Sequence, residues 1–222
     1  MVRSQNSRSN RAPHARKRAD SRRLGILRAA ARVFRRRGFA AAGMREIAEE
    51  AELSPGNLYH YFRGKDEILY FCQDRSLDVM LAAVEAARLS GEPATEQLRR
   101  VVEAHVRCLL DDLEGSAAHL EVEALPDRLR RPLVAKRDRY ERGIREMIAA
   151  GVRRKDLAPC DEEVVTRAIL GASNWTARWF RPEGKRSAAS VAEDVAGFLV
   201  RGLAARPASS LLPRRARARV GA

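Results

Sequence analysis

Cysteine is scarce in this chain, and its few copies lie too far apart to suggest a disulfide framework or a metal centre. The 222 residues include three cysteines, Cys72, Cys108 and Cys160, an odd number with no second ligand at metal-binding spacing. The sequence therefore predicts three buried thiols, no bound metal and no cofactor. Redox sensing by one of these thiols is the less favoured alternative.

Long apolar runs and alternating strand patterns are also missing. No stretch approaches the roughly 18 to 20 apolar residues of a membrane helix, and the polar N-terminal region has no apolar segment of the signal-peptide kind. No run alternates between apolar and polar residues, and alanine, arginine, leucine and glutamate dominate the composition. We therefore expect a nearly all-α protein of about nine helices that resides in the cytoplasm and has no membrane partner.

The grouping of side chains that an enzyme needs is not seen either. Of the four histidines, His14 lies near the N-terminus and His60 lies in a short segment with the apolar spacing of a helix. His105 and His119 have no cysteine or acidic residue at a spacing that marks a catalytic or metal site. We therefore expect a protein that is not an enzyme.

Positive charge is abundant but unevenly distributed, with a formal net charge of +14. Residues 1–23 carry eight basic residues and one acidic residue, and residues 206–222 carry five basic residues and no acidic one. Residues 24–65 have a net charge of +4 and residues 66–205 of −2. A basic N-terminal third suits binding to phosphates, and an arginine-rich arm beside it would strengthen binding without adding specificity. The alternative is that both tails are solvated and inert.

The segment MREIAEEAELSPGNLYHYFRGK, residues 44–65, predicts two short helices around a tight turn. Apolar residues recur at spacings of one, three and four in each half, which gives each helix one buried face. Ser54 offers an N-cap hydroxyl and Pro55 takes the first helical position, so the second helix begins there. A helix of this kind with polar side chains on its outer face suits the major groove of DNA. A two-helix corner of unrelated function is the alternative.

A third helix precedes this segment and ends at Gly38. Together they form the sequence ILRAAARVFRRRGFAAAGMREIAEEAELSPGNLYHYFRGKDEIL, which resembles the DNA-binding domain of the TetR family of bacterial transcriptional regulators. The chain departs from the family pattern at Gly43, where a threonine cap is frequent, and at Glu52, where the helix-to-helix turn usually has glycine. Because a left-handed turn costs a non-glycine residue about 1 kcal/mol, we expect a slightly less stable motif.

The resemblance also implies which side chains contact DNA. The expected base-reading residues are Arg45, Asn57 and His60. The expected phosphate contacts are Ser54, Tyr59, Tyr61 and Lys65, and Gly56 lets the start of the helix approach the DNA backbone. Phosphate contact by Arg45 and pairing of Arg45 with Glu49 on its own helix are the alternatives for that residue.

The rest of the chain reads as a larger helical domain. We expect helices at about residues 66–89, 94–113, 117–125 and 131–150, the last of them closed by Gly151. The expected domains are a disordered basic arm (1–19), a DNA-binding domain (20–80, with the helix-turn-helix at 43–62), an effector-binding and dimerisation domain (81–205) and a disordered basic tail (206–222).

The last two helices carry apolar residues at spacings of three and four, which suggests self-association. By resemblance to the family, they form a four-helix bundle with a second copy, and the twofold dimer sets two reading helices about 34 to 36 Å apart. The alternative is that both helices complete a monomeric core. The expected interface residues are Val165, Ala168, Ala172, Trp175, Trp179, Val191, Val195, Phe198 and Leu199.

The segment GASNWTARWFRPEGKRS is similar to a TetR subgroup with an NWT…W(Y/F)RP pattern, several members of which respond to acyl-CoA thioesters. An acyl chain needs an apolar tunnel, and a nucleotide diphosphate needs arginines at its mouth. The two tryptophans of this segment are the weaker ligand candidates, because such residues more often serve packing. The candidate effector-binding residues are His105, His119, Asn174, Arg178, Arg181 and Lys185.

These patterns favour a ligand-released repressor that binds a palindromic operator on double-stranded DNA as a homodimer, with an acyl-CoA thioester as its small-molecule effector. The alternative is a sequence-tolerant architectural DNA-binding protein without an effector, which both basic tails would suit.

Overall fold

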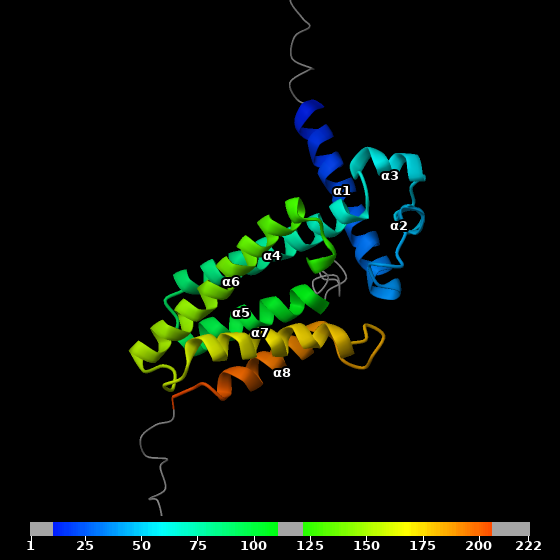
Figure 1. Ribbon diagram of the computed structural model, residues 1–222. Coiled ribbons are helices and arrows are strands. Elements are labelled where there is room, and N and C mark those ends of the chain that lie inside the picture. Colours follow the sequence, from blue (N-terminus) through cyan, green and yellow to red (C-terminus); the bar gives the residue numbers. More distant parts are fainter. Residues whose placement is uncertain (1–10, 111–121, 206–222) are drawn as a thin grey trace, which may run out of the picture.

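The computed structural model describes residues 11–110 and 122–205, and within these ranges the protein is all-helical, as predicted. Eight α-helices lie there, and the described residues form no β-pairing beyond an isolated bridge between Leu157 and Ala204. No helix of the described part has the length and apolarity to cross a membrane. The elements are α1 (Arg11–Arg37), α2 (Met44–Glu50), α3 (Pro55–Tyr61), α4 (Lys65–Leu89), α5 (Ala94–Leu110), the 3-10 turn η2 (Val122–Ala124), α6 (Asp127–Arg154), α7 (Glu162–Trp179) and α8 (Ala188–Arg201) (Figure 1).

The N-terminal helix is longer than expected. Helix α1 begins at Arg11, so residues 11–19 of the expected disordered arm are helical. It ends before Gly38, which adopts a φ of 75° as predicted. Residues 1–10, the tail 206–222 and most of the helix expected at 117–125 lie outside the described residues, and so does His119.

The bounds of helix α6 also differ from those predicted. It begins at Asp127, four residues before the expected start, and it runs through Gly151 to Arg154. The turn that ends it is at Lys155, with a φ of 63°. Gly151 serves packing instead, because a Cβ at this position would lie 2.5 Å from the Cβ of Ala94 and 2.7 Å from Cδ1 of Leu157. The glycine that predicted a helix stop thus marks a close approach between two parts of the body.

Two hydrophobic cores divide the molecule into a head (α1 to α3) and a body (α4 to α8). In the head core, Ile47, Leu58 and Phe62 are at most 1% exposed, and the start of α4 closes the core. Leu125, which follows η2, and Leu133 of α6 also belong to this core. The body therefore holds the head through the region of η2 and α6 as well as through α4.

The cysteines belong to these cores. Cys72 and Cys108 are buried, as predicted, whereas Cys160 is only half-buried. Burial raises the pKa of the Cys72 thiol to about 12, which keeps it protonated at neutral pH and unreactive.

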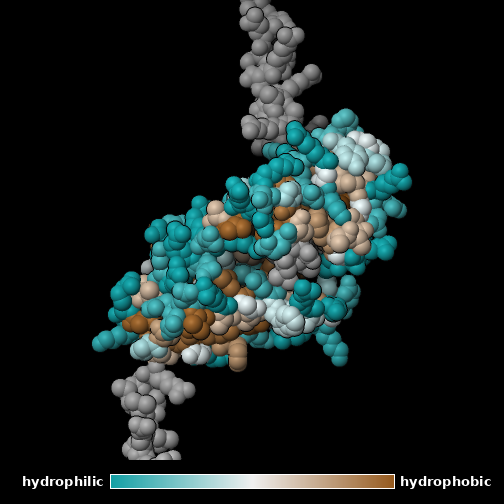
Figure 2. Space-filling view, in the orientation of Figure 1, coloured by the Kyte–Doolittle hydropathy of each residue, from teal (hydrophilic) through white to brown (hydrophobic). Residues whose placement is uncertain are grey.

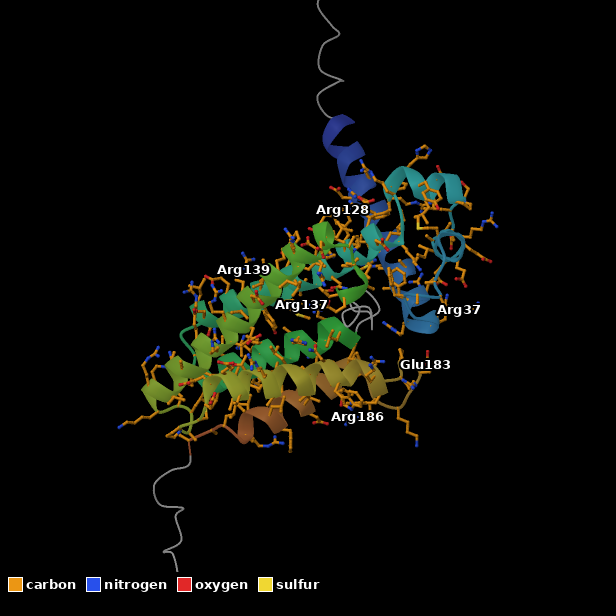
Figure 3. The ribbon with its side chains drawn as sticks, viewed as in Figure 1. Arg37, Arg128, Arg137, Arg139, Glu183 and Arg186 are labelled. Carbon is orange, nitrogen blue, oxygen red and sulfur yellow. The ribbon has the colours of Figure 1, made fainter. Side chains whose placement is uncertain are left out.

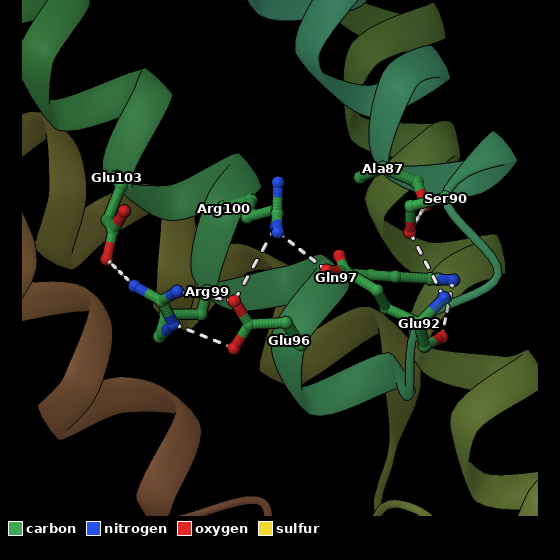
Figure 4. A network of polar contacts seen from close by, with 8 residues as sticks. All are labelled: Ala87, Ser90, Glu92, Glu96, Gln97, Arg99, Arg100 and Glu103. Atoms are coloured by element: carbon green, nitrogen blue, oxygen red, sulfur yellow. Dashed lines mark hydrogen bonds and ion pairs between the residues drawn. The ribbon is translucent and has the colours of Figure 1, made fainter.

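Much of the positive charge of the body is neutralised by neighbouring carboxylates. Along α5, Arg99 bonds both Glu96 and Glu103, and Arg100 lies 2.6 Å from the carboxylate of Glu92 (Figure 4). Pairs of this kind at the surface contribute at most about 1 kcal/mol each. Their main effect here is electrostatic, because they leave the body nearly neutral and the head basic.

Candidate nucleic-acid interface and ligand cavities

The helix-turn-helix is closed by a left-handed residue between α2 and α3. The Leu53 amide donates to the Ala48 carbonyl at 2.8 Å, and the Glu52 amide donates to the Glu49 carbonyl at 3.0 Å. These two bonds define a Schellman motif, whose left-handed position is most often glycine. Glu52 occupies it with a φ of 54°, so the strain predicted from the sequence is present.

Replacing Glu52 by glycine should stabilise the head. The change removes a left-handed conformation that costs about 1 to 2 kcal/mol, and part of this gain is offset by the greater chain entropy of glycine in the unfolded state. We expect the free energy of unfolding, measured with urea, to rise by about 0.5 to 1 kcal/mol. The matched control is Glu49→Gly, which removes the same charge inside α2 and should lower stability by a similar amount. Equal effects of the two changes on stability would contradict the conclusion that the left-handed turn at Glu52 is strained.

Helix α3 has one buried face and one exposed face. Leu58 is fully buried and Phe62 follows it at the C-cap, whereas Asn57, Tyr59 and His60 are exposed. The Ser54 hydroxyl accepts a hydrogen bond from the Asn57 amide at 3.2 Å and caps the helix as predicted. Two other predicted contact positions, Gly56 and Arg45, are also exposed, and Tyr61 is half-buried. Apart from the half-buried Tyr61, these expected contact residues are thus accessible to a ligand outside the head.

The arginines at the end of α1 help to hold α2. Arg32 Nε and Arg36 Nη2 each lie 2.6 Å from a different carboxylate oxygen of Glu50. The hydrogen bonds from Arg36 and then Arg32 hold the pKa of the Glu50 carboxyl below its ordinary value. The stability from this clamp is therefore present at neutral pH and is lost as the pH falls through the lowered pKa. Among the described residues Arg45 has no ion pair with Glu49, so that alternative is not supported.

Lys65 is predicted to contact phosphate, but its ammonium is bound by backbone carbonyls within the head. Its ammonium donates to the carbonyls of Phe39, Ala40 and Ala42 at 3.0, 2.9 and 3.1 Å, and it lies 4.8 Å from the ring centre of Phe39. An ammonium has three donors, and all three are engaged by the loop between α1 and α2. Phosphate contact by Lys65 is therefore at odds with this geometry, and the side chain instead ties α4 to that loop.

A stripe of small and large apolar residues is exposed along α7. Trp175 is 65% exposed, and Phe198 is 72% exposed on α8, which like α7 packs against α5. Hydrophobic atoms gather along the lower edge of Figure 2, where α7 and α8 lie in Figure 1. Of the predicted interface residues, Ala168, Ala172, Trp175, Trp179 and Phe198 are exposed, and Val165, Val195 and Leu199 are half-buried. Val191 is the exception, because it is 2% exposed and packs in the body core.

His105 and Asn174 meet in a cavity of about 240 Å³ inside the body. His105 lies 3.0 Å from both the Tyr140 hydroxyl and the Asn174 Oδ1 atom. Burial lowers the pKa of His105 to about 4, against a smaller opposing effect of Asn174, so the ring is neutral at pH 7. Since Oδ1 only accepts, Nε2 carries the proton and Nδ1 accepts from Tyr140.

Sequence reasoning missed Tyr140 and Arg137, which complete this cavity from α6. Burial raises the pKa of Tyr140 and lowers that of the half-buried Arg137. Leu77 and Met80 of α4 also line the cavity. The helical spacing of α6 places its tyrosine on the inner face, but only the crossing of α6 with α5 brings it to His105.

The remaining effector candidates lie elsewhere. Arg178 and Arg181 line a second cavity of about 480 Å³, which opens between the end of α1 and the end of α7. Lys185 is exposed in the following loop and lines neither cavity. The structure therefore divides the predicted effector residues between two sites.

Two family models match the chain. The model described as bacterial regulatory proteins of the tetR family matches residues 26–70, which include the helix-turn-helix. The model described as the tetracyclin repressor-like C-terminal domain matches residues 91–203. The two matches correspond to the head and to most of the body.

Curated relatives are also transcriptional regulators. The activator FasR of Mycolicibacterium smegmatis is 36% identical over 110 residues, which cover 50% of this chain and 48% of that protein. The chain thus spans about half the length of FasR. The repressor KstR2 of Mycobacterium tuberculosis is 27% identical over 194 residues, which cover 83% of this chain and 94% of that protein.

Solved structures have the same arrangement of helices. The regulator PfmR from Thermus thermophilus superposes with a TM-score of 0.71 at 34% identity, covering 79% of this chain and 97% of that one. AibR in complex with isovaleryl coenzyme A and operator DNA superposes with a TM-score of 0.67 at 22% identity, covering 81% and 98%. At 22% identity, the similarity to AibR shows a shared fold alone.

Proposed function

Since this chain belongs to the TetR family of bacterial regulatory proteins, we propose that it is a cytoplasmic homodimeric repressor, released from a palindromic operator by an acyl-CoA thioester. The observation that carries the proposal is the division of α3 into a buried face and an exposed face. Leu58 anchors the helix in the head, and Asn57, Tyr59 and His60 face outward, where they can contact base edges and phosphates.

The homodimer is supported by the apolar stripe on α7 and α8. Large exposed apolar patches on a folded chain mark interaction surfaces, and two tryptophans of one helix lie in this one. A twofold axis through this stripe would present two heads to one face of DNA. Because each head reads one half-site, the operator is a palindrome.

The proposal of an acyl-CoA effector is supported by the chemistry of the cavity of about 240 Å³ that His105 and Asn174 line. Leu77 and Met80 offer an apolar wall for an acyl chain. The side-chain NH2 group of Asn174, whose Oδ1 atom is held by His105, can donate a hydrogen bond to a carbonyl oxygen. A cavity wall on α4 also suits a switch, because α4 connects body and head. AibR, of the same fold, was crystallised with isovaleryl coenzyme A, which is consistent with this class of ligand.

The test combines DNA binding with ligand binding. At fixed salt, the protein should bind a palindrome from its own promoter at least about 1,000-fold more tightly than random DNA, since specific and non-specific affinities of regulators differ by this factor or more. Equal affinity for both would favour an architectural protein instead.

A thermal-shift series with acyl-CoA esters tests the effector. A ligand at about 100 times its dissociation constant stabilises the folded protein by about 2.7 kcal/mol, which is a clear rise in melting temperature. The same ester should lower operator affinity. If no ester shifts the melting temperature, the acyl-CoA assignment fails while the DNA-binding assignment stands on its own test.

A further inference from the structure

The side chain of Arg23 lies against two aromatic rings where the head meets α4. Its guanidinium carbon is 5.1 Å from the ring centre of Phe62 and 4.8 Å from that of Phe71. The two rings also contact each other edge to face, with their centres 5.9 Å apart. A guanidinium within about 6 Å of a ring centre is attracted by the negative face of the ring. Arg23 therefore makes two cation–π contacts at once.

These contacts join three helices. Arg23 lies near the middle of α1, whose last residue, Arg37, is labelled in Figure 3. Phe62 is the C-cap residue of α3, and Phe71 lies in the second turn of α4. In Figure 1 the start of α4 lies against α1. A single side chain thus contacts the end of the proposed reading helix and the helix that leads into the body.

The space beside this group is open. A cavity of about 680 Å³ between α1 and α4 is lined by Arg23, Phe62 and Phe71, together with apolar residues of both helices. Because open space lies next to the rings, no packed neighbour is ready to replace the guanidinium if the side chain at position 23 is changed. The contact of Arg23 with the rings therefore has no substitute nearby.

Helix α3 depends on contacts of this kind for its orientation. It is seven residues long, and a helix this short is held by packing rather than by its own propensity. The ring of Phe62, 1% exposed, anchors its C-terminal end, and the Phe62 amide donates to the Leu58 carbonyl at 3.1 Å. A shift of this ring would turn the helix and, with it, the exposed side chains of Asn57 and His60.

We propose that Arg23 is a positioning residue for DNA recognition, whose guanidinium fixes the orientation of α3 by holding the rings of Phe62 and Phe71. The inference rests on the proposed function, because it takes α3 as the helix that reads the operator. Arg23 precedes residues 26–70, which the tetR family model matches, so this contact is an addition to the matched domain.

Loss of the contact has a specific consequence for binding. Without the guanidinium, α3 samples further orientations, and only a fraction of the molecules presents the reading side chains correctly. The apparent affinity for the operator falls by that fraction. Random DNA is held through phosphates, which carry no sequence information and do not require one orientation of the base-reading side chains. Its affinity is therefore expected to stay unchanged.

The first experiment compares operator and random DNA at fixed salt, with variants of the full-length protein. Arg23→Met keeps an apolar side chain of similar length but removes the cation. It should lower operator affinity at least about tenfold and leave the affinity for random DNA within about twofold of the parent. Arg23→Lys keeps a cation at the rings and should bind the operator more tightly than Arg23→Met. An Arg23→Met protein with parent affinity for the operator would overturn the proposal.

Direct contact of Arg23 with phosphate is the competing explanation. Loss of such a contact would weaken binding to operator and random DNA equally and would change the slope of log affinity against log salt by about 0.9. That result would overturn the positioning role. The matched control is Arg22→Met, because Arg22 is the preceding residue of α1, is exposed and has no ring contact among the described residues. It should leave the ratio of the two affinities unchanged, and an equal fall of this ratio in both variants would also overturn the role of the rings.

Hydrogen exchange tests the position of α3 without DNA. In Arg23→Met the Phe62 amide should exchange at least about tenfold faster than in the parent, whereas amides of α5 in the body core should keep the parent rate. A parent that binds its operator no better than random DNA would defeat the proposed function, yet faster exchange at Phe62 would still support the role of Arg23. Unchanged exchange at Phe62 in the variant, or equal acceleration in α3 and α5, would overturn it.

Discussion

Replacing Lys65 by methionine is expected to lower the free energy of unfolding of the head by about 3 kcal/mol and to weaken operator binding with it. The side chain donates three charge-assisted hydrogen bonds to carbonyls of the α1–α2 loop, and such bonds contribute about 1.5 to 3 kcal/mol each, less when they share a partly exposed site. Methionine fills a similar volume but leaves the carbonyls of Phe39 and Ala42 without this donor. Urea unfolding followed by circular dichroism measures the loss.

Salt dependence distinguishes this structural role from contact with phosphate. A phosphate contact changes the slope of log affinity against log salt by about 0.9, whereas a residue that only shapes the head leaves the slope unchanged. The matched control is Arg45→Met, which removes one charge from an exposed position of α2 and should change stability by less than about 0.5 kcal/mol. A Lys65→Met protein of normal stability with a reduced salt slope would restore the phosphate assignment.

Replacing Trp175 by glutamate is expected to convert the proposed dimer into monomers and to lower operator affinity at least about 100-fold. The side chain is 65% exposed on the isolated chain and lies in the apolar stripe of α7. A glutamate there would have to bury an unpaired charge at the interface, which costs several kcal/mol. A monomer also loses the second half-site, whose binding is intramolecular once the first is bound. Sedimentation equilibrium and operator titration measure the two effects.

A second exposed apolar residue provides the control. Leu89, at the end of α4, is 74% exposed and lies outside α7 and α8. Leu89→Glu introduces the same charge and should leave both the dimer and the operator affinity unchanged. If Trp175→Glu sediments as a dimer with parent affinity, this stripe is not the interface that positions the heads.

How much of the fold can be predicted from the sequence depends on how far apart along the chain the interacting residues lie. The cap formed by Ser54, the left-handed turn at Glu52 and the stop at Gly38 depend on neighbouring residues of the chain, and all three are confirmed. The prediction for Gly151 is wrong, because this glycine packs against Ala94, a residue of a different helix. The apolar faces of the helices are predictable in the same way, because a helix buries residues only three and four positions apart.

The predictability of the candidate site is more limited. The outer face of α3 follows from helix geometry once its inner face is known, so the exposure of Asn57 and His60 is predictable. The partners of Lys65 lie 23 to 26 residues away along the chain, so no local pattern indicates that its donors are engaged. Val191 likewise has the spacing of an interface residue, but only its contact with the body core shows which side of α8 faces inward.

By itself, the sequence determined an all-helical chain, the position and polarity of its DNA-reading helix, and a motif with one strained turn, because caps, turns and periodicity are properties of a few adjacent residues. The tertiary structure alone decided that Lys65 holds the head together, that His105 and Asn174 share a cavity with Tyr140, and that arginines of α1 and α7 surround a second one. These relations join helices far apart in the chain, and their geometry exists only once the packing of the cores has fixed how the helices cross.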